Sequence, residues 1–525
     1  MQLILLFTDM GETSVFQLAL LLLATITLAT SRSAQPQPPS KPHIVFMLVD
    51  DWGWADVGYH RTTSTKEIVT PNIDSLVKVG LQLDQHYVYN YCSPSRAALL
   101  SGRLPIHVND ADTSQSCYNP KDPVSGYTGI PRNMTVISAR MKEAGYATHQ
   151  VGKWDAGMAT PDHTPKGRGF DSSLGYFHHA NDYFNETEGS CNKTPIVDLW
   201  DTDKPASDLN GTGADNYEEA LFKDRLLKVV TNHNPSMPLF LYYAPHIVHM
   251  PYEVPNEYLK KFDFIDDKLR QVYHAMVNYL DDVVGELVQA LKDKGLWDNL
   301  LFIASSDNGG PVNTGKAANN YPLKGGKHTN WQGGVRVNAF ASGGFLPESM
   351  RGQTTEGYIH IADWYATFCA LAGVDPTDKQ AEKANLPPID SLNMWPLISG
   401  QNSTSPRTDI PLTLTALISS DYKILVGDNR DAGWTGPVYP NSTHPNGGID
   451  AVEHCGDSGC LYNIKEDPEE HVNLASKMPD ILKTMQTKLS KYQATHFNPD
   501  RGSVWPGACE AALNNYGGFW GPFLP

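Results

Sequence analysis

The stretch His-Ile-Val-Phe-Met-Leu-Val at residues 43–49, followed at once by Asp50 and Asp51, decides the fold. An uninterrupted apolar run of this length is typical of a strand that is buried on both faces of a parallel sheet. The two acids then stand at its carboxyl end, which is where open α/β sheets bind their ligands. The sequence therefore predicts a buried strand that delivers two carboxylates to a site.

Two further apolar runs end in the same way. Residues 299–306 lead into Asp307 and Asn308, and residues 238–246 (PLFLYYAPH) end near His246 and His249. Because the carboxyl ends of parallel strands meet at one edge of a sheet, we expect these acids, the amide and the histidines to converge.

Amphipathic stretches lie between the strands at residues 70–80, 135–145 and 274–295, with apolar spacing of three and four and a glycine at the end. Strands that alternate with such helices predict an α/β fold whose sheet is covered on both faces. Around residue 400 the composition becomes polar and rich in breakers, and short strands and one helix follow. We expect a large domain over 42–400 and a small α+β domain over 405–525.

The formal net charge of −17 excludes proteins that bind nucleic acids or anionic membranes.

Residues 16–30 have the length of a signal-peptide core, so we expect a signal peptide over 1–33, a secreted or lysosomal protein and no stable membrane span. Asp9 and Glu12 stand where positive charge is usual, which leaves an uncleaved anchor as the alternative. Six Asn-x-Ser/Thr sequons agree with a glycoprotein of the secretory route, at Asn133, Asn185, Asn192, Asn210, Asn402 and Asn441.

Seven cysteines are an odd number for an oxidising compartment, where disulfide bonds are expected. At least one cysteine is therefore left for another purpose. Cys369, in a helical pattern, is a candidate for a buried free thiol, and the pairing of the others stays open.

The side chains expected at the sheet edge offer a set of oxygen ligands only. Such a set suits a hard cation such as Ca²⁺ or Mg²⁺ and does not suit zinc. Two adjacent acids taken alone are more often a helix cap or a turn, but the second acid-amide pair favours a metal site. The predicted ligands are Asp50, Asp51, Asp307 and Asn308.

Residues 91–103, YCSPSRAALLSGR, place Cys92 at the start of a predicted helix, in the positive field of free backbone N–H groups. The order Cys-Ser-Pro-Ser-Arg at 92–96, with Leu99 and Ser-Gly-Arg at 101–103, resembles the signature of the sulfatases. The likeness runs from about residue 43 to about residue 475 and is similar to the arylsulfatase B, I and J branch of the alkaline-phosphatase-like superfamily. It implies a large mixed sheet flanked by helices, with 42–400 as the catalytic domain.

The resemblance also implies a chemistry. Cys92 would be converted to formylglycine by a formylglycine-generating enzyme, and residue 92 would join the four predicted ligands around one Ca²⁺ per chain. Arg96 would steady this centre, while Lys153, His249 and Lys327 would hold the sulfate and assist the leaving oxygen. The substrates implied are sulfate esters: aryl sulfates in vitro and sulfated saccharides in vivo.

One position departs from the family pattern. Where the family commonly has Gly-Lys-Trp-His, this chain has Asp155 after Gly152-Lys153-Trp154. We expect Asp155 to replace the missing histidine as a general base, since carboxylates serve so when their surroundings set their pKa. The alternative is that Asp155 only pairs with a lysine and that one of three histidines does this work: His163, His178 or His179.

Two other functions compete with the sulfatase prediction. A phosphoesterase of the same superfamily would need a second metal, for which the sequence offers no equally clear ligands. A catalytically inactive sulfated-glycan-binding relative is suggested by Asp155, although the nucleophile and the metal acids are present. Residues 156–215 and 311–321 are the segments expected to select the substrate.

Overall fold

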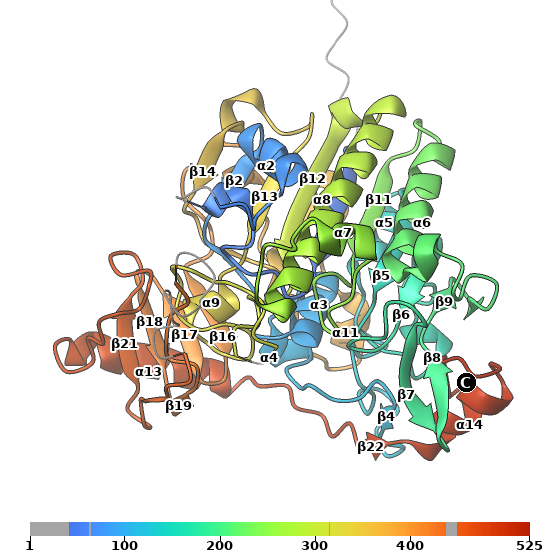
Figure 1. Ribbon diagram of the computed structural model, residues 1–525. Helices are drawn as coiled ribbons and strands as arrows, with labels where there is room; N and C mark the ends of the chain where they lie inside the picture. The colour runs from blue at the N-terminus through green and yellow to red at the C-terminus, as the bar shows by residue number, and fades with distance from the viewer. Residues whose placement is uncertain (1–40, 62–64, 314, 437–448) are drawn as a thin grey trace, which may run out of the picture. The chain divides into compact units, whose positions relative to one another are not determined.

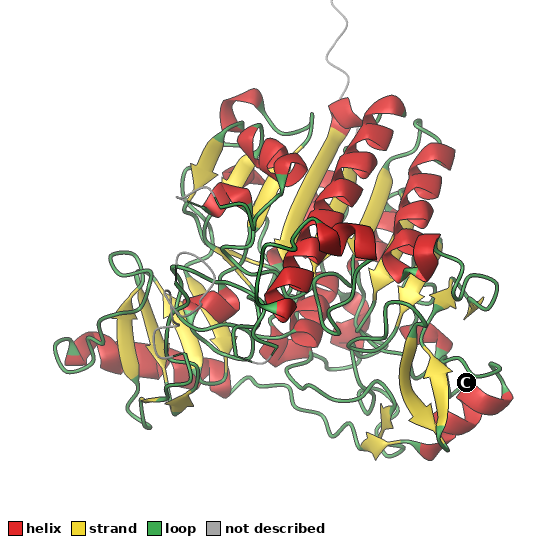
Figure 2. Cartoon of the chain, viewed as in Figure 1, coloured by secondary structure: helices red, strands yellow, loops and turns green. Residues whose placement is uncertain are grey.

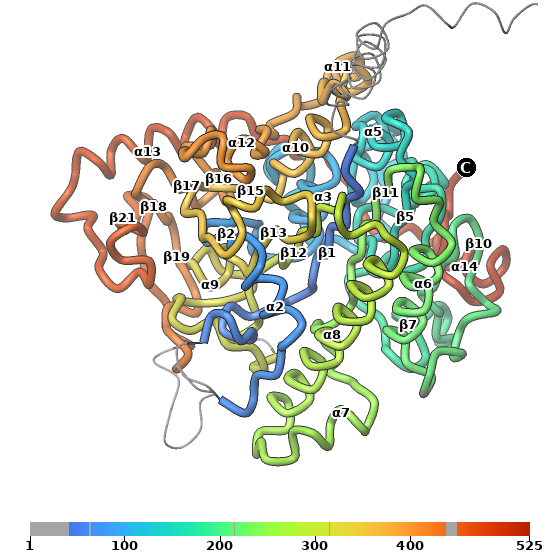
Figure 3. The backbone as a smooth tube through the Cα atoms, turned by 90° about the horizontal axis from the view of Figure 1, so that it is seen from above, coloured from blue at the N-terminus to red at the C-terminus, as the bar shows by residue number. Residues whose placement is uncertain are grey.

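Figure 1 shows the large sheet, and strand β1 (His43–Val49) lies inside it, between β11 (Leu239–Ala244) and β12 (Leu300–Ser306) (Figure 3). Both neighbours run parallel to β1, and Val49 stands beside Ser306 in the register. The three apolar runs of the sequence are therefore adjacent parallel strands, as predicted.

The large sheet is mixed. Pairing is antiparallel between β12 and β13, between β13 and β2, and at the β6-β9-β10 edge, and it is parallel elsewhere. The α/β fold with a large mixed sheet is thus confirmed. In spatial order the strands are β10 (Lys204–Pro205), β9 (Trp200–Asp201), β6 (Ser172–Tyr176), β5 (Ala147–Lys153), β11, β1, β12, β13 (Ala339–Ser342), β2 (Leu81–Leu83) and β14 (Gln353–Thr355).

Helices cover both faces of this sheet, as Figures 2 and 3 show. Alternate β1 side chains belong to two apolar clusters, with Phe46 in one and Met47 in the other. One face is covered by α3 (Cys92–Ser101), α5 (Ile137–Glu143) and α10 (Asp363–Ala372). The other is covered by α2 (Pro71–Lys78), α6 (Glu218–Asn232) and α8 (Lys268–Asp293). The carboxyl edge of the sheet is thereby held between two rigid layers.

A second sheet follows residue 408, with four antiparallel strands in the order β16 (Asp409–Thr413), β17 (Ala416–Ser419), β18 (Tyr422–Leu425) and β21 (Cys460–Asn463). Helix α13 (Pro479–Gln493) packs Met485 and Leu489 onto this sheet. Residues 42–525 form one compact unit by their contacts, so the boundary expected near 400–405 stays a prediction.

The C-terminal segment after α13 returns to the region of the large sheet. Strand β22 (Ser503–Val504) pairs with β4 (Cys117–Tyr118), and the Trp505 N–H donates to the Ser116 carbonyl at 2.9 Å. Helix α14 (Pro506–Asn514) carries Cys509, which forms a disulfide with Cys191. Residues 503–505 are therefore fixed against the segment that ends at residue 118, and α14 is fixed to β7 (Thr187–Cys191) by the disulfide.

The remaining elements are short. The paired strands are β3 (His86–Tyr87) with β15 (Ile359–His360), β7 (Thr187–Cys191) with β8 (Thr194–Val197), and β19 (Asp428–Asn429) with β20 (Glu453–His454). The short helices are α4 (Pro105–Val108), α7 (Asn256–Lys260), α9 (Gln332–Val335), α11 (Lys379–Lys383) and α12 (Trp395–Ile398).

This computed structural model describes residues 41–61, 65–313, 315–436 and 449–525. The predicted signal peptide and the sequon at Asn441 lie outside these ranges. Within them, no helix combines the length and the apolar character that crossing a membrane requires.

A second disulfide joins Cys455 and Cys460, and the cysteines left free are Cys92, Cys117 and Cys369, all three buried.

Candidate active site

The acids that follow β1 and β12 meet at the sheet edge, as the sequence predicted. Asp50, Asp51, Asp307 and Asn308 are all buried. The Asp51 N–H donates to Asp307 Oδ1 at 3.3 Å, and Asn308 Nδ2 donates to Asp51 Oδ1 at 2.7 Å. Asp51 has a φ of 58°, a left-handed conformation that aspartate tolerates better than most residues, and the chain turns sharply there.

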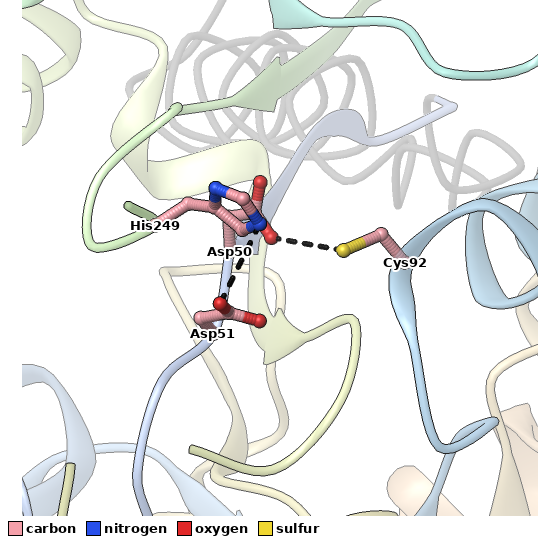
Figure 4. A group of neighbouring side chains, drawn as sticks. All are labelled: Asp50, Asp51, Cys92 and His249. Atoms are coloured by element: carbon pink, nitrogen blue, oxygen red, sulfur yellow. Dashed lines mark hydrogen bonds and ion pairs between the residues drawn. The ribbon is translucent and has the colours of Figure 1, made fainter. Parts of the chain in front are cut away.

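Cys92 is the first residue of α3, a helix that is buried throughout. Its Sγ lies 3.3 Å from Asp50 Oδ1, across the site from β1 (Figure 4). Burial, followed by Asp307 and Asp50, holds the pKa of the Cys92 thiol well above its usual value. An unmodified Cys92 is therefore a neutral thiol here, which is a weak nucleophile.

Arg96 lies one turn further along α3, and its guanidinium is fully buried. Its Nε and Nη2 both donate to Asp307 Oδ2, at 3.0 and 2.8 Å, and its Nη1 donates to the Lys153 carbonyl at 3.3 Å. Two hydrogen bonds from one guanidinium fix a carboxylate in position as well as in charge. The helix thus brings a potential nucleophile and a cation to the same acids.

Two lysines pair with the remaining acids, and a histidine lies beside them. Lys153 Nζ lies 2.6 Å from Asp50 Oδ2, and Lys327 Nζ lies 2.7 Å from Asp51 Oδ1. His249 Nε2 lies 3.6 Å from Asp51 Oδ2, as Figure 4 shows. Burial alone would raise the pKa values of Asp50 and Asp51, but Lys153 and Lys327 respectively lead the groups that lower them below the usual range.

Lys153 owes its place to the end of β5. Gly152 before it has a φ of 99°, and a Cβ there would lie 1.9 Å from the Ala244 carbonyl oxygen of the neighbouring strand. Only glycine allows β5 and β11 to approach so closely at that conformation.

The carboxylate and amide oxygens of this group fit a divalent cation. Asp50, Asp51, Cys92 and His249 each offer a ligand atom, and these atoms lie within 4.8 Å of one another. Asn308 Oδ1 is buried and has no hydrogen-bond partner among the described residues, which is costly unless a cation or a donor meets it. Asp307 differs from the expectation in one respect, because Arg96 already occupies its Oδ2.

Asp155, the departure from the family pattern, is fully buried and has a φ of 49°. Its Oδ1 accepts a hydrogen bond from Gln115 Nε2 at 2.8 Å and lies 3.0 Å from His179 Nδ1. Lys153 Nζ is more distant, at 3.9 Å from Oδ2. The main partner of Asp155 is thus a histidine and not a lysine.

A cavity of about 180 Å³ opens onto this group. Of the three alternative histidines, His179 lines it, whereas His178 pairs with Asp198 at 2.8 Å and His163 is buried beside Thr160. The full lining is Asp51, Tyr91, Cys92, Asp112, His179, His249, Met250, Pro311, Lys327 and His328.

Sequence reasoning did not find Asp112 and Gln115. Both come from an irregular loop between α4 and β4 that carries no motif and no apolar periodicity. The structure also groups His249 with the acids, while His246 is held by Glu218 through Nδ1 at 3.1 Å and does not line the cavity.

Comparison with known proteins agrees with this geometry. The Sulfatase family matches residues 42–374. Arylsulfatase J of Mus musculus is 32% identical over 505 residues, which cover 92% of this chain and 80% of that protein. N-acetylgalactosamine-6-sulfatase of Homo sapiens is 32% identical over 378 residues, which cover 70% and 67% of the two chains.

Solved structures give the same result. The crystal structure of Ps i-CgsB in complex with k-i-k-neocarrahexaose matches with a TM-score of 0.67 and 28% identity, over 89% of this chain and 95% of that one. The buried acids around Cys92 thus occur in a chain that resembles sulfatases along most of its length. The protein belongs to the sulfatase family and is a sulfuric ester hydrolase.

Proposed function

We propose that this protein hydrolyses sulfate esters of saccharides at the cavity beside residue 92, with residue 92 as formylglycine and Ca²⁺ as the metal. One observation carries the proposal: a cysteine at a helix start lies 3.3 Å from a buried carboxylate, among two lysines and an arginine. Sulfatases generally use formylglycine and a divalent metal. The unreactive thiol that burial produces here is consistent with a cysteine that acts only after modification.

The proposed metal ligands are Asp50, Asp51, Asp307, Asn308 and residue 92, with the unpartnered Asn308 Oδ1 as the clearest support. A bound Ca²⁺ would polarise the sulfate and orient it as a Lewis acid. Arg96 keeps Asp307 in place and offsets its charge. Oxygen ligands around a hard cation favour Ca²⁺ or Mg²⁺ over transition metals.

The cations of the site have separate tasks in this proposal. Lys327 and His249 line the cavity and would bind the sulfate oxygens directly. Lys153 does not line the cavity and instead forms an ion pair with Asp50. Charges fixed in advance stabilise the negative charge that develops on the ester oxygen.

A saccharide sulfate is the substrate class that the relatives support. One relative is named for N-acetylgalactosamine 6-sulfate, and one matching structure holds a neocarrahexaose. The cavity rim offers a tilted pair of rings, Tyr91 and His328, with centroids 5.9 Å apart, against which a sugar ring can pack. Exposed sequons at Asn185, Asn192 and Asn402 and two disulfides support a glycoprotein of the secretory pathway.

The decisive experiment concerns residue 92. Protein made together with a formylglycine-generating enzyme should contain an aldehyde at residue 92 by peptide mass spectrometry, and should cleave an aryl sulfate much faster than the matching aryl phosphate. Cys92→Ala should abolish turnover and leave the melting temperature nearly unchanged. Cys369→Ala, which alters a free cysteine buried in the apolar core, should keep its activity. Full activity with an unmodified thiol at residue 92 would refute the mechanism, and preferred phosphate turnover would favour a phosphoesterase.

A further inference from the structure

A line of polar side chains runs from the buried edge of β5 to the mouth of the cavity. Asp155 is fully buried and lies 3.0 Å from His179 Nδ1. His179 Nε2 lies 3.3 Å from Asp112 Oδ1. The exposed fraction of the side chain rises along this line from 0% at Asp155 to 34% at His179 and 54% at Asp112.

His179 is the group in the cavity best placed to accept a proton. Lys327 is held as a cation by Asp51, and His249 has its Nδ1 2.5 Å from the Met250 carbonyl and its Nε2 toward Asp51. Burial and then Lys327 lower the pKa of His328, although Asp51, Asp112 and Asp431 oppose them. His179 alone of these groups has one nitrogen against a buried acid and the other against an acid that reaches solvent.

Hydrolysis of a sulfate ester at neutral pH must release a proton. In the balanced reaction, R–O–SO₃⁻ and H₂O give R–OH, SO₄²⁻ and H⁺; the ester S–O bond breaks, and a new S–O bond forms to the oxygen that water supplies. No oxidant or reductant is needed. In a cavity of about 180 Å³ that is lined by the cation Lys327, the proton needs a neutral acceptor and a route outward.

We propose that His179, whose Nδ1–H is held by Asp155, accepts on Nε2 the proton released in the cavity, and that Asp112 takes this proton from Nε2 and passes it to solvent. This inference rests on the proposed sulfate-ester hydrolysis at residue 92. Asp155 then acts through His179 and does not itself touch the reacting atoms. Gln115, which donates to Asp155 at 2.8 Å, holds the carboxylate in the orientation that the imidazole requires.

The electrostatics of the line are consistent with this role. Burial would lower the pKa of His179, but Asp155 and then Asp112 outweigh burial and Lys153 and raise it above the ordinary value. Against the effect of burial, His179 and Lys153 lower the pKa of Asp155 to about 2, so Asp155 keeps its charge over the whole working range. Because only neutral His179 accepts a proton, kcat should fall as the pH drops through the pKa of His179.

The activity test uses three variants and a matched pair of controls. His179→Gln should lower kcat by about 100-fold or more, change KM little and remove the acidic limb of the pH profile. Asp155→Asn keeps an acceptor but loses the charge, so it should lower kcat and move that limb to lower pH. Asp112→Asn should give a smaller shift in the same direction. His178→Gln and Asp198→Asn alter the adjacent histidine-acid pair outside the cavity and should leave the profile in place.

A second readout does not depend on the modified enzyme. In Cys92→Ala protein, the exchange rate of the imidazole C2 hydrogen, followed across pH by peptide mass spectrometry, reports the pKa of His179. Adding Asp155→Asn should lower this pKa, while exchange at His178 should stay the same. An unchanged pKa of His179, or a His179→Gln enzyme with normal kcat and pH profile, overturns the inference. If Cys92→Ala itself remains active, the proposed function fails instead.

Discussion

Two buried lysine-carboxylate pairs in this protein have nearly the same distance between nitrogen and oxygen, but their pKa values are shifted in opposite directions. At the edge of the large sheet, Lys153 Nζ lies 2.6 Å from Asp50 Oδ2; in the small sheet, Lys423 Nζ lies 2.7 Å from Glu470 Oε1. All four side chains are fully buried. Despite burial, the pKa of Lys153 is raised and that of Asp50 is lowered, so both are held in their charged forms. Burial dominates in the other pair, lowering the pKa of Lys423 and raising that of Glu470.

The difference lies in the neighbours. Asp50 is surrounded by Lys153, His249 and Arg96, which together outweigh burial. Lys423 has one strong partner and the repulsion of Lys324. Several opposite charges around a buried group favour its charged form, and such a concentration is costly unless function requires it. Because both regions contain a buried ion pair, the presence of such a pair alone does not distinguish the active site from the small sheet.

The largest expected effect comes from breaking the pair at the site. Asp50→Asn leaves Lys153 with only Asp155, 3.9 Å away, as a carboxylate partner. Loss of one member of a buried pair costs about 3–5 kcal/mol of stability, and activity should fall by at least a factor of about 1,000 because the metal and Lys153 both lose a partner. Calorimetry and steady-state kinetics measure the two effects.

Glu470→Gln is the matched control for Asp50→Asn. It should lower the melting temperature, because Lys423 loses its carboxylate partner, and it should leave kcat unchanged. If Glu470→Gln impaired turnover as strongly as Asp50→Asn, the distinction between the two pairs would be wrong.

Metal removal should have an effect of intermediate size on activity and stability, and this effect should depend on the active-site pair and not on the small-sheet pair. Four buried oxygen ligands stabilise the folded state when a cation binds, by about 2.7 kcal/mol at 100 times Kd. Wild type and Glu470→Gln stripped with a chelator should lose activity and melting temperature, and Ca²⁺ should restore both. Asp50→Asn should respond weakly. Stripped wild-type protein that retains full activity would contradict the metal proposal.

The smallest effect is expected from removing the small-sheet pair altogether. Lys423→Met combined with Glu470→Gln keeps an acceptor for the Gln332 N–H, which Glu470 Oε2 now accepts at 2.7 Å. Replacing a buried ion pair by uncharged residues is often neutral or stabilising, so unfolding free energy should change by less than about 1 kcal/mol and kcat should not change. Denaturant titration measures the difference, and a loss of several kcal/mol would show that the pair contributes substantially to stability.

The sequence predicted most of the sheet and most of the site, because both depend on short segments with strong local signals. The run 43–49 can only be a buried strand, and the acids after it and after β12 then have to meet. Asp112 and Gln115 could not be predicted, since their positions are set by the packing of a loop without local pattern. The same holds for His179: the sequence offered three histidines near Asp155, and only tertiary geometry separates His179 from its neighbour His178.

The returning C-terminal segment sets an order of assembly during synthesis. The loop that supplies Asp112 and Gln115 is hydrogen-bonded at both ends to residues translated almost 400 positions later. Arg501 Nη2 donates to the Val108 carbonyl at 3.0 Å, a separation of 393 residues, and the Trp505 N–H donates to the Ser116 carbonyl. Among the described residues, the last strand of the large sheet ends at Thr355, so these strands leave the ribosome well before this segment does. A chain terminated near residue 495 would thus carry the whole sheet and Cys92 but lack the support of the cavity mouth. The mouth is completed only after residues 501–505 have been translated.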